Sequence, residues 1–248
     1  MNTIYALWLR QLKRFFRSKP RVIGSIGQPL LFLVALGFGF SAIFQKAGEG
    51  NYIQFLVPGV ISMGIIFTGL FSGIEIIWDR KFGFLKETLV APTSRLEIMI
   101  GRTLGGATVA SIQGCLVFLL SLLVGFRPVD LSILPLAFVF VFLTALLFTA
   151  LGTAIASLLE DMQGFQLIMN FLVMPLFFLS GALFPLDGLP KTLGFISSIN
   201  PLSYGVDGLR GTLTGASHFG LFSDFLALGI VTIIITIIGS YLFSKIEI

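Results

Sequence analysis

Six long apolar blocks, separated by charged or turn-forming stretches, constrain this chain more than any other feature of its sequence. A helix of about 20 apolar residues crosses the hydrocarbon core of a bilayer, and each block is long enough for one span. The pattern therefore predicts an all-α membrane protein with six transmembrane helices in a single domain over residues 1–248. The blocks cover roughly residues 22–44, 53–77, 103–126, 133–158, 165–184 and 222–243.

The composition excludes several classes of protein. Charged residues make up 11% of the sequence, whereas soluble domains carry about 25%, so a large soluble catalytic domain is excluded. A net charge of +4 gives no reason to expect a nucleic-acid partner. With one cysteine and one histidine, the chain has no disulfide framework and no His- or Cys-rich metal site. We expect no metal ion and no cofactor on this chain.

The distribution of Lys and Arg predicts the orientation. If the N-terminus is cytoplasmic, twelve of the sixteen Lys and Arg residues fall on the cytoplasmic side, as the positive-inside rule requires. An even number of spans then places both termini in the cytoplasm. We expect a multi-pass protein of the cytoplasmic (inner) membrane.

No sequence motif supplies catalytic chemistry. A G-x-x-x-x-G-K-[ST] loop, a G-x-S-x-G elbow and an H-E-x-x-H pair are all absent from the sequence, so we expect a transport protein rather than an enzyme. The one carboxylate well inside a block is Glu75. It is either an anchor paired near the interface with Arg80 or Lys81, or a functional acid within the membrane.

The N-terminal segment, residues 1–21, is predicted to form an amphipathic helix in the membrane interface. Cations gather within about a third of the helical wheel, and aromatic and apolar residues cover the opposite face. The helix either anchors the topology or acts as a lever, joined to the first span at a bend at Pro20. The residues that we expect at the membrane interface are Trp8, Arg10, Arg14 and Arg17.

The cytoplasmic loop over residues 78–102 is predicted to contain a short helix. Residues 84–89 favour a helix with Leu85 and Leu89 on one face, and Pro92 ends it. Ser94 then caps a new helix, with Glu97 completing a capping box. A solvated turn that only carries topological charges is one interpretation; the exposed apolar residues rimmed by charge favour a docking surface.

Residues 185–221 are predicted to form short helices that re-enter the outer side of the membrane. Asn200 and Pro201 mark a helix start, and Asp207 and Arg210 are spaced to form an ion pair. Irregular backbone at membrane depth must be buried in protein or face a cavity. The segment is either an outer gate or a structural cap, with gate residues Pro185, Asn200, Pro201, Tyr204, Asp207 and Arg210.

Spans one, two and five contain prolines, which favour contact with protein or a cavity over contact with lipid. Apolar side chains on two of these spans suit a hydrophobic or amphipathic cargo, although residues of this type more often pack or face lipid. The residues predicted to line the path are Met63, Phe67, Phe71, Asn170, Met174 and Phe178.

The order of these elements resembles the membrane subunit of type-2 ABC exporters, in the drug-resistance and polysaccharide or lipid export branch. The resemblance covers essentially the whole chain. It rests on the K-E-T-L…P-T-S-R loop and, more specifically, on F-L-S-G-A-L-F-P-L-D-G-L-P over 178–190 and N-P-L-S-Y-G-V-D-G-L-R over 200–210.

The resemblance implies a permease that works as a dimer, with a second copy or a homologous permease, and is driven by a separate ABC ATPase subunit that binds ATP and Mg²⁺. It implies that the loop at 84–92 is the coupling helix, with contact residues Phe84, Leu85, Lys86, Glu87, Thr88, Leu89 and Pro92. Membrane lipids would be the other partners. The alternatives are a self-sufficient channel or secondary carrier and, with less support, a membrane-integral enzyme.

Overall fold

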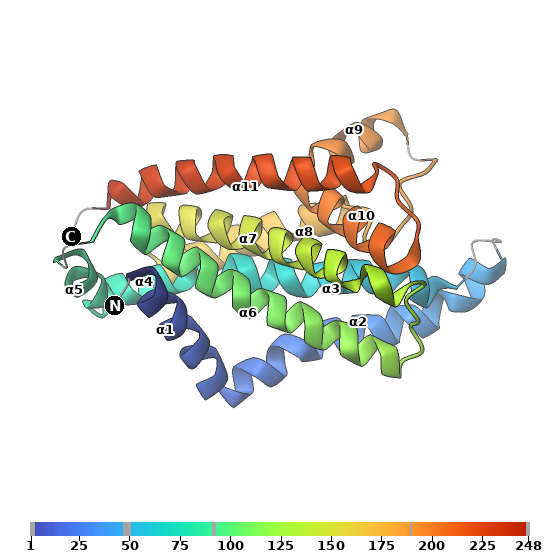
Figure 1. Cartoon of the computed structure of the whole chain (residues 1–248), viewed down its shortest axis with the longest axis horizontal. Coiled ribbons are helices and arrows are strands. Elements are labelled where there is room, and N and C mark those ends of the chain that lie inside the picture. Colours follow the sequence, from blue (N-terminus) through green and yellow to red (C-terminus); the bar gives the residue numbers. More distant parts are fainter. Residues whose placement is uncertain (1–2, 47–50, 91–92, 189, 247–248) are drawn as a thin grey trace.

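The computed structural model describes residues 3–46, 51–90, 93–188 and 190–246, and every regular element in these ranges is a helix (Figure 1). Most long helices run side by side along the length of one elongated bundle. The elements are α1 (Thr3–Arg17), α2 (Lys19–Lys46), α3 (Tyr52–Ser72), α4 (Ile74–Lys81), α5 (Phe84–Val90), α6 (Arg95–Leu123), the short 3-10 helix η1 (Leu131–Ile133), α7 (Leu134–Leu158), α8 (Met162–Phe178), α9 (Lys191–Ile199), α10 (Pro201–Thr214) and α11 (Leu221–Ser244).

Five of the described helical stretches are long and apolar enough to cross a membrane, and α8 is a shorter apolar helix. The predicted fifth block at 165–184 ends early, at Phe178. Just beyond it, Gly181 has a φ of 75°, a left-handed conformation that glycine adopts without strain. The turn there ends the helix before it reaches the length of the other spans. The five spanning stretches are Val22–Ser41, Tyr52–Lys81, Arg95–Leu123, Leu131–Leu158 and Leu221–Ser244.

The two ends of the bundle carry different short helices. Helices α4 and α5 lie at the end to which both chain termini return, and we call it the α5 end. Helices α9 and α10 lie toward the opposite end, the α10 end (Figure 1). The return of both termini to one end agrees with an even number of crossings. Which end faces the cytoplasm stays a prediction from the charge pattern.

Small residues bring the central helices into backbone contact. A Cβ on Gly73 would lie 2.2 Å from the Gly152 carbonyl oxygen, so α7 and the α3–α4 junction touch backbone to backbone. A Cβ on Gly105 would lie 2.6 Å from the Gln11 side chain, and one on Gly101 would lie 3.1 Å from the Ile4 backbone. Small residues at helix spacing permit such approach in membrane proteins. Gly101 and Gly105 of α6 thereby form the surface on which α1 packs, which we call the glycine seat.

Helix α1 turns into α2 over a single residue, Ser18, with Pro20 in the first turn of α2. Proline fits there because the first backbone N–H groups of a helix have no partner within it. The predicted bend is confirmed, and Figure 1 shows α1 and the start of α2 meeting at a sharp angle away from the bundle.

Candidate coupling and transport sites

Helix α5 forms where the sequence predicts a short helix, over Phe84–Val90. Gly83, with a φ of 81°, turns the chain from α4 into it. Beyond the loop, the Ser94 hydroxyl accepts from the Glu97 backbone N–H at 3.1 Å, and the Glu97 carboxylate accepts from the Ser94 N–H. This reciprocal capping box confirms the predicted start of α6. Pro92 lies outside the described residues.

The faces of α5 differ from the simplest sequence expectation. Leu85 is 1% exposed and packs into the core, whereas the Phe84 ring is 51% exposed. Lys86 and Glu87 are also exposed, and the Thr88 hydroxyl donates to the Phe84 carbonyl oxygen at 2.9 Å. The side chain of Leu89 lies outside the described structure. The outward surface of α5 is therefore an aromatic ring beside two opposite charges, and Leu85 holds the helix to the bundle.

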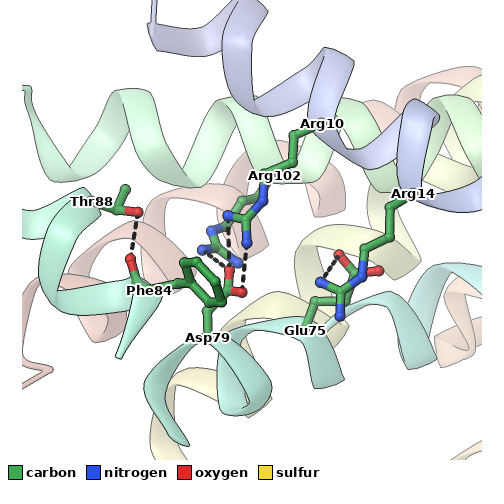
Figure 2. A network of polar contacts seen from close by, with 7 residues as sticks. All are labelled: Arg10, Arg14, Glu75, Asp79, Phe84, Thr88 and Arg102. Carbon is green, nitrogen blue, oxygen red and sulfur yellow. Dashed lines mark hydrogen bonds and ion pairs between the residues drawn. The ribbon is translucent and has the colours of Figure 1, made fainter. Parts of the chain in front are cut away.

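An ion-pair cluster ties α1, α4 and α6 together beside α5 (Figure 2). The Asp79 carboxylate accepts from Arg10 of α1 at 2.8 Å and from Arg102 of α6 at 2.5 Å. Asp79 and Arg102 are both buried. The Arg10 guanidinium also lies 5.6 Å from the centre of the Phe84 ring, within range of a cation–π contact. One carboxylate thus links three helices, and Arg10 adds α5 to them.

Glu75 belongs to the same cluster. Its carboxylate is buried and lies 3.6 Å from the Arg14 guanidinium of α1, as Figure 2 shows. The proximity of Arg80 in sequence suggested that residue as a partner, but Arg80 reaches Glu160 at 3.5 Å and the Leu159 carbonyl oxygen instead. The geometry supports the anchor interpretation of Glu75, with α1 as the element that is anchored.

The residues predicted at the membrane interface divide into two groups. Trp8 donates its indole N–H to the Thr108 hydroxyl at 3.0 Å, so it packs on α6. Arg10 and Arg14 point at carboxylates, as described above. Arg17 remains exposed, as does Lys13. The helical wheel of α1 places all its cations on one face. Because α1 packs on protein, part of that face contacts buried carboxylates instead of lipid headgroups.

A pocket of about 310 Å³ lies between α1, α2, α3, α4 and α6. Three of the predicted path residues, Met63, Phe67 and Phe71, line it. The rings of Phe67 and Phe71 stack with their centres 6.1 Å apart. The remaining walls mix apolar and polar residues, and most of the pocket surface is apolar. Their polar side chains are Gln11, Ser25, Gln28, Thr68, Ser72, Glu75 and Gln113.

The three predicted path residues of α8 do not join that pocket. Asn170, Met174 and Phe178 lie on the outer face of α8 and are exposed. The opposite face of α8 carries Phe165 and Phe177, which are buried against the bundle. The structure therefore separates the predicted path into a pocket-lining half on α3 and an outward-facing half on α8.

Helix α10 starts as predicted. The Asn200 side chain accepts from the Leu202 N–H at 3.0 Å, and its amide nitrogen donates to the Leu176 carbonyl oxygen at 2.7 Å. Pro201 occupies the first turn. The Tyr204 hydroxyl, from one of the predicted gate residues, donates to the Ser198 carbonyl oxygen at 2.6 Å. Most of α10 is buried, so it fills the bundle at this end.

The predicted ion pair between Asp207 and Arg210 is wrong. Arg210 donates to the Gly181 carbonyl oxygen at 2.8 Å and lies 4.0 Å from the centre of the Phe55 ring. Asp207 accepts from the His218 and Phe219 backbone N–H groups at 2.8 Å each. Both side chains leave α10 and satisfy backbone groups of neighbouring segments, because those groups are buried and need partners.

A pocket of about 420 Å³ at the α10 end includes Pro185, Asp207 and Arg210 among its walls. The His218 ring lies 2.9 Å from the Asp187 carboxylate across its mouth. That pair joins the α10–α11 turn to the loop after α8. Three predicted gate residues thus meet in one place.

Several residues of these sites escape sequence reasoning. Asp79 and Arg102 stand at the ends of apolar blocks and resemble ordinary topological charges. Asp187 and His218 are too far apart in sequence for any spacing rule to join them. Gln28 and Gln113 did carry a signal, because a carboxamide within an apolar block requires a hydrogen-bond partner.

A family profile described as ABC-2 type transporter matches residues 2–214 of the chain. The chain belongs to the ABC-2 type transporter family. The match extends from α1 through α10, so it includes α5, the ion-pair cluster and the pocket lined by Met63, Phe67 and Phe71. These features therefore belong to a transport permease of this family, and the resemblance noted in the sequence is confirmed at the level of the family.

Curated relatives agree with this assignment. The putative transport permease ycf38 of Cyanophora paradoxa is 33% identical over 262 residues, which cover 99% of this chain and 89% of the relative. Nodulation protein J of Rhizobium leguminosarum bv. viciae is 26% identical, over 85% of this chain and 82% of the relative. The inner membrane transport permease YadH of Escherichia coli (strain K12) is 28% identical, over 89% of this chain and 86% of the relative.

Proposed function

We propose that this ABC-2 permease is the membrane subunit of an ATP-driven exporter in the cytoplasmic membrane. It works as a dimer, with a second copy or a homologous permease, and moves a hydrophobic or amphipathic substrate outward. The energy comes from a separate ABC ATPase, which carries the ATP and Mg²⁺. Both termini and the α5 end face the cytoplasm, as the Lys and Arg distribution favours.

One observation carries this proposal: the position of α5. It is a short helix at the end of the bundle, anchored by buried Leu85, that presents Phe84, Lys86 and Glu87 outward. An exposed aromatic ring beside charges is typical of a docking surface. No P-loop motif occurs in the sequence, which supports an ATPase carried by a separate chain.

The ion-pair cluster gives a route by which force on α5 reaches the membrane spans. Phe84 contacts Arg10, Arg10 shares Asp79 with Arg102, and α1 continues into α2. A displacement of α5 therefore acts on α1 and α6 together. This favours the lever interpretation of α1 over a purely topological anchor.

Co-purification tests the proposal. The tagged chain, extracted from its native membrane, is expected to bring down an ABC ATPase. The charge swap Lys86→Glu with Glu87→Lys should reduce ATPase recovery by about tenfold or more, because like charges then face the partner's surface and cost more than about 1.4 kcal/mol. Both residues are exposed, so folding is unaffected.

The matched control is Lys191→Glu, an exposed charge of α9 at the other end of the bundle, which should leave ATPase recovery unchanged. Leu85→Asp is a poor test, because burial of that side chain makes it a folding mutation. Absence of any ATPase from the purified wild-type complex, or transport by the chain alone in ATP-free liposomes, would contradict the proposal and favour a channel or secondary carrier.

A further inference from the structure

The pocket between α1, α2, α3, α4 and α6 has a mainly apolar surface, but the polar side chains among its walls add hydrogen-bonding groups that a purely apolar cargo does not require. The Gln113 side chain, 1% exposed, forms its floor. Its amide nitrogen donates to the Ser25 carbonyl oxygen at 2.5 Å, and its oxygen accepts from the Thr68 hydroxyl. Both ends of this carboxamide are satisfied, so it fixes α2 and α3 against α6. The pocket is a built feature of the bundle.

The hydroxyl groups of Ser25, Thr68 and Ser72 around the pocket already donate hydrogen bonds within the protein. Ser25 donates to the Val22 carbonyl oxygen at 2.9 Å and Ser72 to that of Gly69 at 2.6 Å, while Thr68 donates to Gln113. A hydroxyl oxygen has two lone pairs that still accept. The walls therefore offer acceptors, and a ligand that matches them brings donors such as hydroxyl groups.

Gln28 marks the mouth of the pocket. It lines the cavity and is exposed on α2 within the candidate span Val22–Ser41. Its carboxamide has no hydrogen bond to any side chain or backbone group in the part of the chain that the structure describes. An unpaired amide facing hydrocarbon costs free energy, and a polar group bound there removes the cost. Gly24, one turn earlier, is also exposed, with open space around its Cα.

The charge of the pocket restricts the ligand further. Its one acidic wall residue, Glu75, is paired with Arg14, and the other polar walls are amides and hydroxyls. A charged group placed here, within the membrane, would lack a counter-ion among these residues, which is expensive. The apolar walls, which include Met63, Phe67 and Phe71, make up most of the surface and suit an apolar chain. The volume of about 310 Å³ is at the lower end for ligand pockets, the size of a headgroup rather than of a whole lipid.

We propose that this pocket binds the uncharged, hydroxyl-bearing headgroup of an amphiphile that enters from the bilayer past Gln28 and Gly24, with its apolar part against Met63 and Phe67. The site is distinct from the docking surface on α5, and binding to it does not depend on an ATPase.

Photolabelling in nanodiscs tests the site directly. The full chain is reconstituted in phosphatidylcholine with a trace of monoglucosyl diacylglycerol that carries a diazirine in one acyl chain. Labelled peptides are expected from α2, α3 and α6. Phosphatidylglycerol with the same chain should label these peptides at least about fivefold less, since its charge is uncompensated.

Two variants with matched controls locate the site. Gln28→Leu should reduce glucolipid labelling about fivefold, as expected for about 1 kcal/mol of lost hydrogen bonding, and Gly24→Phe should block the mouth. The controls are Gln166→Leu on the exposed face of α8 and Gly27→Phe, which also has open space around it. Both should label like the wild type.

Equal labelling of all four variants, or equal labelling by phosphatidylglycerol, would overturn the inference. Because this measurement needs no ATPase, its result is separate from the co-purification test. Repeating it with the co-purified ATPase and ATP distinguishes the two sources of such a ligand. Transported cargo would leave the pocket and lose labelling, whereas a resident bilayer lipid would keep it, and either result supports the site.

Discussion

The two ends of the bundle hold their buried charges in different ways. At the α5 end, Asp79 pairs with arginines from two other helices. At the α10 end, Asp207 accepts mainly from backbone N–H groups, and Arg210 donates to a backbone carbonyl. Side-chain ion pairs join separate elements, and long arginines can follow their partner as it moves. Backbone-held charges instead fix the shape of one local segment.

The difference suits two tasks. Under the proposed coupling to an ATPase, the α5 end has to stay connected while its helices shift against each other, which flexible side chains allow. The α10 end has to keep irregular backbone satisfied at membrane depth, where each unpaired group is costly. We therefore expect motion at the α5 end and a fixed cap at the α10 end.

The largest expected effect comes from breaking the ion-pair cluster at its centre. Asp79→Asn leaves Arg102 buried without its counter-ion and should lower the free energy of unfolding by about 3–5 kcal/mol, measured by denaturation in detergent. The control is Glu160→Gln, an exposed carboxylate at the same end, which should cost less than about 1 kcal/mol. Equal costs for the two variants would refute the central role of Asp79.

Double-mutant cycles compare the two ends directly. The Asp79→Asn and Arg102→Gln pair should show a coupling energy of about 1–3 kcal/mol, because the two side chains share an ion pair. The Asp207→Asn and Arg210→Gln pair should show a clearly smaller coupling, because each side chain has other partners. A larger coupling at the α10 end would mean that the ion pair expected from the sequence does form in the membrane.

Removal of a helix cap gives a medium effect. Ser94→Ala deletes one half of the capping box of α6 and should cost about 1 kcal/mol. Hydrogen exchange in the first turn of α6 should speed up accordingly. Ser198→Ala, which removes an exposed hydroxyl bonded only to the Phe195 carbonyl oxygen, is the control. Unchanged exchange near Ser94 would show that the cap contributes nothing.

The smallest effect is expected at Lys13. Its side chain is exposed and carries no ion pair to the described residues, so Lys13→Gln should change stability by less than about 0.5 kcal/mol. Arg14→Gln, one residue on, removes the partner of buried Glu75 and should cost more. Thermal unfolding of the two variants side by side provides the measurement. Indistinguishable curves would show that the Arg14–Glu75 ion pair does not stabilise the fold.

The sequence predicted much of the fold because its signals are local. Apolar blocks locate the long helices, Ser94 and Asn200 mark two helix starts, and Pro20 marks the bend after α1. The fifth block was predicted, but its end was placed at residue 184 instead of Phe178, because the left-handed turn at Gly181 is hidden in a continuous apolar run.

The sites were predicted in part, for a physical reason. Helical periodicity shows which residues share a face but not what that face contacts. Arg10 and Arg14 therefore looked like headgroup ligands, although α6 and α4 bring acids to them. In the same way Asp207 and Arg210, three residues apart, suggested each other as partners, whereas buried backbone groups from distant segments compete for both.

The glycine seat on α6 has a consequence for how α1 behaves. Helix α1 cannot slide or roll without lifting off, because its backbone at Ile4 and its side chain at Gln11 already lie close against Gly101 and Gly105. Any tilt of α6 must therefore swing α1 as one rigid body, and the single residue at Ser18 passes that swing to the first turns of α2. The position of the amphipathic helix α1 in the surrounding lipid would then change with the tilt of the bundle helices.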